Sequence, residues 1–287
     1  MEKFFKEVSI LAQKALLYEV LLSPKPGLVD RNNSGAHDDM DIFTFTDSIL
    51  VLGEYFEKCA SSGYFHNGKE FSTILDVIRP LGIEAEKKMF AATNGINTHK
   101  GAIFIFGILS AAIGLVKSQK EVMDIKTLTS RAGHISGNIL EDFNLNFSQK
   151  DKLTYGEKQY LKYGSYGIRG EAKDGFPSII IAYDVLNDNL KSGWDFQVSM
   201  GEAFLKLTEI VFDSNVVGRK GLEGLRILKD STMEAVRLGS YKTAAGMCKL
   251  EEIDKKFIKL RISPGGCADL CAATVFLHWI IERFKNL

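Results

Sequence analysis

Apolar residues recur at steps of three and four along most of the chain, with polar residues between them. This is the period of an α-helix that buries one face. The first such segment starts near Phe4 and must end at Ser23, because the residue before Pro24 is pushed out of helical geometry. Further helical segments are expected at about 45–60, 70–92, 102–116, 122–140, 177–186, 198–212, 221–238, 250–261 and 270–284.

Several details of this pattern bear on the fold. Pro80 falls inside the third segment, so we expect either a kink or two shorter helices there. Pro177 suits the first turn of its helix. Two short apolar runs, at 103–106 and 179–181, could be buried strands, but both continue for helical lengths. With no linker-like stretch, the chain is predicted to form one all-α domain over residues 1–287, a large helical bundle with its functional loops at one end.

Composition narrows the class of protein. The chain has 287 residues, 45% apolar and 25% charged, with a formal net charge of zero. These values describe an ordinary globular protein and argue against a general nucleic-acid binder, which would carry a basic excess. The apolar run 102–116 is shorter than the roughly 20 residues of a membrane span, so we expect a core helix and no membrane partner. A charged N-terminus and four cysteines without CxxC spacing indicate a cytoplasmic protein with reduced thiols.

The longest polar segment, residues 24–41, lies between two helical segments and holds two prolines and two glycines. It cannot form regular structure. Cations beside carboxylates, on a loop held by rigid neighbours, are typical of a site for a phosphorylated, metal-chelated ligand. A solvated connector is the alternative, since the same residue types also crowd ordinary turns.

Three further polar segments also combine glycine with a cation and a carboxylate or amide. Any one of them could be a helix cap or a surface ion pair, but all four stand where helices begin or end, which suggests convergence on a polyphosphate. His37 and His99 lie in these segments and could be structural hydrogen-bond partners or neutral donors to a phosphate. The other candidates are Lys25, Asp30, Arg31 and Asp39; Asn97 and Lys100; Arg169 and Glu171; and Asp213, Asn215 and Arg219.

Common nucleotide and nucleophile motifs are missing from the sequence. It contains no GxxxxGK[ST] pattern, no GxGxxG after a strand and no GxSxG elbow. If the chain binds ATP, it therefore does so by neither common nucleotide fold.

Taken together, the polar segments resemble the triphosphoribosyl-dephospho-CoA synthase family, in the order expected for that family. The resemblance extends from about Glu19 to Phe276, and its last motif adds Ser263, Gly265 and Gly266 to the phosphate-binding candidates. The motifs are PKPGLVDRNNSGAHDDMD, GINTHKGAIF, GSYGIRGEAKDGFPS, DSNVVGRKG and SPGGCADL.

The resemblance implies a specific reaction. The family transfers the 5-triphosphoribosyl unit of ATP to the ribose 2′-hydroxyl of 3′-dephospho-CoA and releases adenine. The product is the precursor of the prosthetic group on the acyl carrier subunit of citrate lyase or malonate decarboxylase, and it is passed to a transferase of the holo-acyl-carrier-protein synthase type.

Residue types suggest roles within that reaction. Breaking the C1′–N9 bond develops oxocarbenium character, so one carboxylate should stabilise C1′ and another should accept the hydroxyl proton. Glu171 is the hypothesis for the general base, because Arg169 beside it could orient both carboxylate and substrate; Asp30 competes, and Asp39 is a further catalytic candidate. The expected triphosphate clamp is Lys25, Arg31, Lys100, Arg169 and Arg219, and the expected magnesium ligands are Asp39 and Asp41, then Asp213.

Two other functions stay open at this point. One is a magnesium-dependent glycohydrolase of the ADP-ribose type, in which water replaces the ribose hydroxyl. The other is a non-catalytic nucleotide-binding protein that uses the same cationic loops. The oligomeric state is not fixed by the sequence, and a homodimer is one option.

Overall fold

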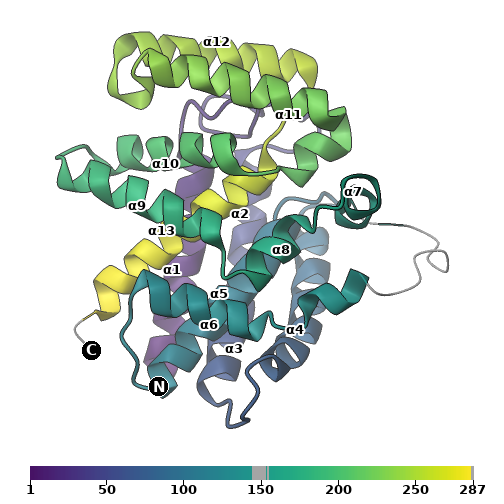
Figure 1. The fold of residues 1–287 in the computed structure, drawn as a ribbon, viewed down its shortest axis with the longest axis vertical. Helices are drawn as coiled ribbons and strands as arrows, with labels where there is room; N and C mark the ends of the chain where they lie inside the picture. The colour runs from purple at the N-terminus through teal and green to yellow at the C-terminus, as the bar shows by residue number, and fades with distance from the viewer. Residues whose placement is uncertain (144–152, 154, 286–287) are drawn as a thin grey trace.

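The computed structural model describes residues 1–143, 153 and 155–285. In this part of the chain, helices joined by loops make up the whole architecture and no strand occurs (Figure 1). The predicted all-α fold is therefore confirmed, and the runs at 103–106 and 179–181 both lie inside helices.

The centre of the molecule is helix α5 (Lys100–Ser118), which is buried along most of its length. It is long and apolar enough to cross a membrane, yet 78% of its most apolar stretch is buried inside the protein, as expected of a core helix. Helix α3 (Gly53–Tyr64) packs closely against it through two glycines. A Cβ on Gly63 would lie 1.9 Å from the carbonyl oxygen of Ala111, and one on Gly114 would lie 1.9 Å from that of Ala60.

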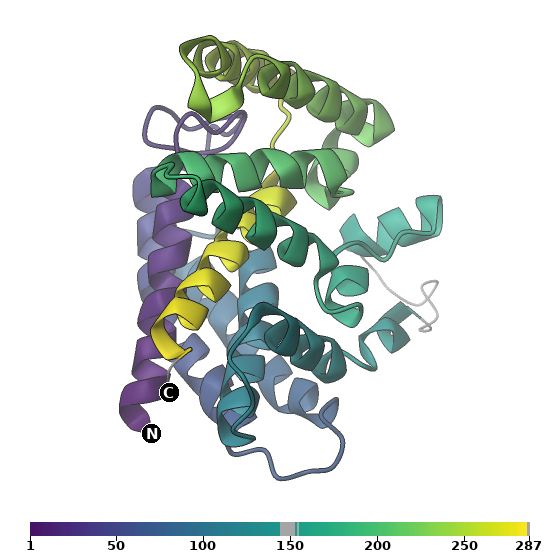
Figure 2. The same cartoon turned by 60° about the vertical axis from the view of Figure 1, so that its left-hand side comes forward.

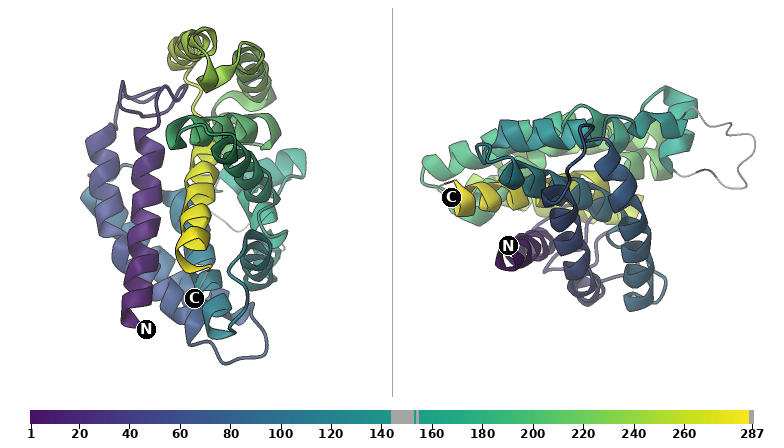
Figure 3. Two further views of the ribbon diagram at one scale, coloured as in Figure 1. Left: turned by 90° about the vertical axis from the view of Figure 1, so that its left-hand side faces the viewer. Right: turned by 90° about the horizontal axis from the view of Figure 1, so that it is seen from below.

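The N-terminal helices surround this core. Helix α1 (Glu2–Leu21) ends where Pro24 predicts, and it runs beside α13 (Gly265–Phe284) (Figures 2 and 3). The segment expected as one helix at 45–60 is two, α2 (Ile42–Val51) and α3, because the chain breaks at Leu52. At Pro80 the two shorter helices do not form, since α4 (Thr73–Ala92) continues through it as one helix. Helix α6 (Ile125–Ile135) is followed by a short 3₁₀ turn (Ile139–Phe143).

The second half of the chain adds two helical pairs. Helices α9 (Pro177–Lys191) and α10 (Phe196–Ile210) lie side by side, with Pro177 in the first turn as predicted. Helices α11 (Ser214–Arg237) and α12 (Ala244–Leu260) lie across the top of Figure 1. Gly221 interrupts α11 with a positive φ of 66°, so the regular helix expected from 221 onward is preceded by additional helical turns.

Three regions that lie at least partly outside the predicted helical segments are partly helical. The region 144–175 contains α7 (Tyr155–Tyr163) and α8 (Gly167–Lys173), while 144–152 and 154 lie outside the described residues. The polar stretches near 213–221 and 263–269 form the first turns of α11 and α13. Capping residues and glycines make a helix start resemble a loop, because helix starts and turns favour the same polar residues.

The long polar segment 22–41 is an irregular loop at the end of α1, beside α12 (Figure 3, left). Residues from the C-terminal third hold it: the Tyr241 hydroxyl donates to the Pro24 carbonyl at 2.6 Å, and the Gly27 N–H donates to Asp254 Oδ1 at 2.8 Å. Gly27 has a φ of 75° and lies so close to Ile262 that a Cβ would be 2.1 Å from its carbonyl oxygen, so only glycine fits there.

Candidate active site

A cavity of about 850 Å³ is lined by residues from the N-terminal ends of four helices, α5, α8, α11 and α13. Its volume falls in the range of roughly 300–1,000 Å³ that is usual for small-molecule sites. Helix N-termini present unpaired N–H groups and a partial positive charge. Three long helices and one short helix that start at one cavity therefore favour an anionic ligand, and phosphate is the group most often bound in this way.

Most of the predicted site residues meet at this cavity, although they come from segments far apart in the sequence. Five predicted residues are not part of its lining, namely Asp30, Arg31, Asp39, Asp41 and Arg169. The predicted residues that do line it are Lys25, His37, Asn97, His99, Lys100, Glu171, Asp213, Asn215, Arg219, Ser263, Gly265 and Gly266.

Lys25 is a buried cation on the cavity wall, with only 1% of its surface exposed. Its Nζ donates to the main-chain oxygen of Glu19 at 2.8 Å and forms an ion pair with the Glu19 side chain. An ammonium group has three N–H donors, and Glu19 occupies two of them. One donor therefore stays available for a ligand in the cavity.

His99 is held by a relay of two hydroxyl groups, one from Ser48 on α2 and one from Thr98, its neighbour in the chain. The Thr98 hydroxyl donates to Ser48 Oγ at 2.8 Å, and Ser48 Oγ lies 2.7 Å from His99 Nδ1. Burial, with a smaller effect of the Lys25 charge, lowers the pKa of His99 to about 3, so the ring is neutral. The other ring nitrogen, Nε2, is buried without a hydrogen-bond partner among the described residues.

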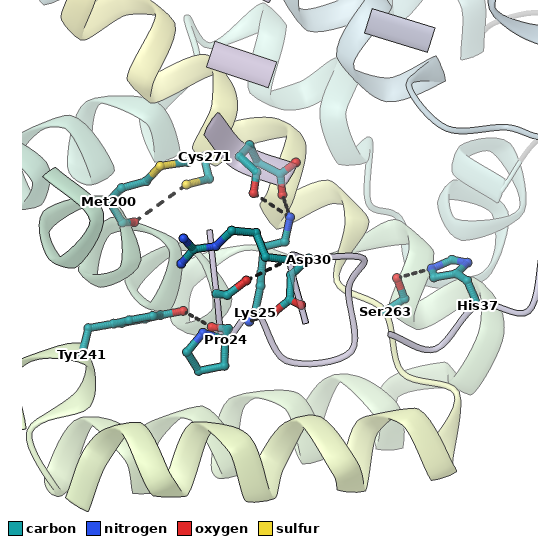
Figure 4. Close-up of polar contacts among 11 residues, drawn as sticks. Pro24, Lys25, Asp30, His37, Met200, Tyr241, Ser263 and Cys271 are labelled. Atoms are coloured by element: carbon teal, nitrogen blue, oxygen red, sulfur yellow. Dashed lines mark hydrogen bonds and ion pairs between the residues drawn. The ribbon is translucent and has the colours of Figure 1, made fainter. Parts of the chain in front are cut away.

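His37 and Arg219 mark the edge of the cavity. His37 Nε2 lies 2.9 Å from Ser263 Oγ, which joins the long loop to the start of α13 (Figure 4). Burial and then the positive charge of Arg219 lower the pKa of His37. Arg219 is exposed, and no carboxylate among the described residues pairs with it. Its charge is therefore open to an anionic ligand.

Asp213 acts as an N-cap that also joins two helix starts. One carboxylate oxygen accepts from the N–H groups of Asn215 and Val216 at 2.9 and 3.0 Å, and the other accepts from the Cys267 N–H at 2.9 Å. Burial raises its pKa, although these three donors oppose the shift. Gly266 packs against the same carboxylate, since a Cβ there would lie 3.0 Å from Oδ2. Asp213 thus fixes α11 and α13 relative to each other.

Glu171, the predicted general base, lines the cavity from α8. Its two oxygens accept from Ser178 Oγ at 2.6 Å and from the Ser178 N–H at 3.1 Å. Each oxygen keeps a further lone pair, so the carboxylate is oriented but still able to accept a proton.

The predicted carboxylates outside the lining have local partners. Asp30 accepts from the N–H groups of Lys25 and Asn32 at 2.9 and 2.6 Å and so shapes the loop. Asp41 caps α2 in a capping box with Thr44. Asp39 keeps its side chain 62% exposed, 3.9 Å from His37.

The predicted cations outside the lining also contact neighbours. Arg31 donates to Gln197 at 3.3 Å. The Arg169 guanidinium lies over the Phe143 ring at 5.1 Å, so it does not stand free beside Glu171.

Two carboxylates of the cavity were not among the predicted site residues. Glu19 is the partner of Lys25, and it was hidden in the apolar pattern of the first helix. Asp269 lies in the second turn of α13, and its position in the GGCAD motif was the available signal. Burial, together with the negative charges of Glu19 and Asp213, raises the pKa of Asp269 well above its usual range, and Lys25 opposes this.

The described residues contain no group of three or more His, Cys, Asp or Glu side chains placed to hold a metal ion. Of the three predicted magnesium ligands, Asp41 and Asp213 use their oxygens as helix caps, and only Asp39 keeps a largely exposed carboxylate. Magnesium in phosphate sites is commonly shared between one or two carboxylates, phosphate oxygens and water. The described residues do not fit an all-protein cage, and the one exposed carboxylate, Asp39, is compatible with the shared mode.

The all-α fold, the convergent helix starts and the buried cation indicate the class: a helical protein with a cavity that suits a phosphorylated ligand and is lined by titratable groups. Residues 5–286 match the family described as ATP:dephospho-CoA triphosphoribosyl transferase. The chain belongs to this family.

Similar proteins extend over almost the same length. The chain is 37% identical to a probable 2-(5''-triphosphoribosyl)-3'-dephosphocoenzyme-A synthase of Streptococcus equi subsp. equi, over 97% of this chain and 98% of that protein. It is also 37% identical to a protein of the same name from Lactiplantibacillus plantarum, over 93% of this chain and 94% of that protein. No solved structure matches the chain.

Proposed function

We infer that this protein transfers the 5-triphosphoribosyl group of ATP to the 2′-hydroxyl of 3′-dephospho-CoA and releases adenine. Family membership over residues 5–286 supports the inference. The structural observation that carries it is one cavity whose lining combines cations and helix starts with carboxylates. That combination suits a reaction in which a triphosphate must stay intact while a bond at the ribose C1′ breaks.

The cations and helix starts would hold the triphosphate. Lys25 has one free donor, and Lys100 and Arg219 line the cavity, although Lys100 Nζ also lies 2.8 Å from Glu86 Oε2. The N–H groups at the start of α11 are taken by Asp213, so the start of α13 would contribute through Gly265 and Gly266. Arginine suits bidentate contacts with phosphate oxygens. With Nδ1 accepting from Ser48, the neutral His99 ring would contribute an Nε2–H donor, which needs a partner once water is excluded.

Glu171 would accept the proton of the attacking 2′-hydroxyl. The O2′–C1′ bond forms as C1′–N9 breaks, and the electron pair of the broken bond leaves with adenine. Ser178 holds the carboxylate in place through both of its oxygens. A carboxylate near C1′ would also stabilise the oxocarbenium character of the transition state.

Magnesium would enter with ATP, and it would neutralise part of the triphosphate charge. Asp39 is the candidate ligand because its carboxylate is exposed beside His37 at the cavity. We place the protein in the cytoplasm. We further propose that its product goes to a transferase that loads the acyl carrier protein of citrate lyase or malonate decarboxylase.

The test is adenine release, measured by chromatography from ATP and magnesium with and without 3′-dephospho-CoA. Release only with both substrates, together with a matching mass gain on dephospho-CoA, is the expected result. Release without the acceptor would instead identify a glycohydrolase, and no release would leave a nucleotide-binding protein.

A matched pair of variants tests the clamp. Arg219 and Arg237 are both exposed arginines on α11, but only Arg219 lines the cavity. Arg219→Gln is expected to raise KM for ATP by roughly 10-fold or more, since a charge-assisted hydrogen bond contributes about 1.5–3 kcal/mol. Arg237→Gln is expected to leave KM unchanged; equal effects of both would remove Arg219 from the clamp.

A further inference from the structure

We propose that Asp269 is the general acid that protonates the departing adenine. This inference rests on the proposed function and adds a residue and a step to it. A purine anion is a poor leaving group, so a positioned proton donor should accelerate C1′–N9 cleavage. The observations that lead to Asp269 are its place in the cavity, its lack of partners and the close packing of the helix beside it.

The carboxyl group of Asp269 faces the cavity at the start of α5. It projects from the second turn of α13 and contacts Gly101 so closely that a Cβ on that glycine would lie 2.0 Å from Oδ2. Gly101 therefore provides the room for this carboxyl group. Among the described residues, none donates a hydrogen bond to it or forms an ion pair with it, unlike Glu19, Glu171 and Asp213.

The charges around Asp269 favour its protonated form. Glu19 on α1 and Asp213 ahead of α11 are negative, Lys25 on the long loop is positive, and α5 presents the backbone of Gly101. Lys25 is already in an ion pair with Glu19, so its positive charge does not serve Asp269 alone. Burial and the two carboxylates raise the pKa of Asp269, which keeps a proton available for transfer.

Asp269 and Glu171 then divide the two proton transfers. Glu171 receives the proton of the 2′-hydroxyl, and Asp269 gives its proton to a ring nitrogen of adenine as C1′–N9 breaks. Neutral adenine leaves, Asp269 becomes a carboxylate and Glu171 a carboxylic acid, so atoms and charge balance. Exchange with water returns both groups to their starting states. Two carboxyl groups in different environments commonly divide acid and base roles in this way.

The experiment compares two donors that differ in leaving group: ATP, and a ribose 5-triphosphate with 4-nitrophenolate at C1′, which departs without a proton. Asp269→Asn is expected to lower kcat with ATP by about 10²–10⁴-fold, but to change kcat with the nitrophenyl donor only a few-fold. Glu171→Gln should slow both donors. Equal slowing of both donors by Asp269→Asn would overturn the assignment.

Controls separate chemistry from folding and from the proposed function. Asp47→Asn makes the same chemical change at an exposed position of α2 and should keep wild-type rates. Gly101→Ala, which pushes on the carboxyl group, should lower kcat with ATP more than with the nitrophenyl donor. If the wild-type protein releases no adenine with both substrates, the proposed function fails first.

A measurement on the wild-type protein keeps the inference testable even if the variants do not fold. Loss of the Asp269 proton at higher pH should lower kcat with ATP on an alkaline limb. That limb should be absent with the nitrophenyl donor. The same limb with both donors would refute a proton transfer to the leaving group.

Discussion

The buried ion pair of Lys25 and Glu19 allows stability and ligand binding to be separated by mutation. The two side chains are only 1% and 5% exposed, and Lys25 also lines the cavity. Lys25→Met leaves the Glu19 carboxylate buried without its cation. Removing one partner of a buried pair costs about 3–5 kcal/mol, a large fraction of the roughly 5–15 kcal/mol by which proteins are stable. For a chain of 287 residues this loss lowers Tm by roughly 5–9 °C.

The double variant Lys25→Met/Glu19→Gln removes the uncompensated charge. Replacing a whole buried pair by neutral residues of similar volume is often neutral for stability, so most of the lost Tm should return. Activity should not return, because the free donor of Lys25 is lost in both variants. We expect kcat/KM for ATP to fall roughly 10–150-fold, as for the loss of one charge-assisted hydrogen bond.

The assays are thermal unfolding and steady-state adenine release in the presence of 3′-dephospho-CoA. Glu19→Gln alone is the matched control, because it keeps the lysine and removes the pairing charge. A double variant that recovers both Tm and kcat/KM would show that Lys25 serves the fold alone, and would refute its place in the triphosphate clamp.

Four shorter predictions follow from other contacts. His99→Gln should reduce the acid sensitivity of folding. In the folded protein the pKa of His99 is about 3, below the ordinary 6.5, so the unfolded chain binds the proton first, and the free energy of unfolding falls by up to about 1.4 kcal/mol per pH unit as pH drops from 6.5 toward 3. Denaturant unfolding at pH 5 and 7 measures this, and equal losses in the variant and the wild type would contradict it. Ser48→Ala removes the hydroxyl group that contacts His99 Nδ1 and should lower kcat/KM for ATP about 5–30-fold. Ser48→Thr keeps the hydroxyl group and should lower kcat/KM less. Asp41→Ser keeps a capping side chain without a carboxylate, so Tm should be nearly unchanged; a raised magnesium requirement would show that Asp41 also binds metal, and an unchanged one that it only caps α2. Gly114→Ala should lower the free energy of unfolding by about 1–3 kcal/mol, since its Cβ would meet the Ala60 carbonyl; calorimetry that shows no loss would mean that α3 moves away freely.

The sequence predicted the helical segments well where the apolar period was continuous. It failed where helix starts are polar. Gly265 to Asp269 looks like a loop because glycines and a carboxylate are turn residues, yet these positions form the first turns of α13. The Cys267 N–H in the first turn of α13 donates to Asp213, which lies 54 positions earlier in the chain, so this contact has no local sequence signature.

The candidate site could also be predicted only in part from the sequence. Residues such as Lys25 and His99 could be named from the polar segments, and the cavity brings them together. Roles that depend on partners could not be assigned. Whether a carboxylate caps a helix, as Asp41 does, or faces a cavity without donors, as Asp269 does, depends on what packs against it.

The contacts that hold loop 22–41 have a consequence for synthesis of the chain. Asn33 Nδ2 donates to Asp254 Oδ2 at 2.8 Å, across a separation of 221 residues. At about 5–20 residues per second, the loop leaves the ribosome roughly 10–45 s before the residue that fixes it. Throughout that interval the loop that carries Lys25 lacks its contacts with Asp254, and a chain that stops before α12 never acquires them. The proposed triphosphate clamp, to which Lys25 belongs, can therefore be completed only when translation is almost finished.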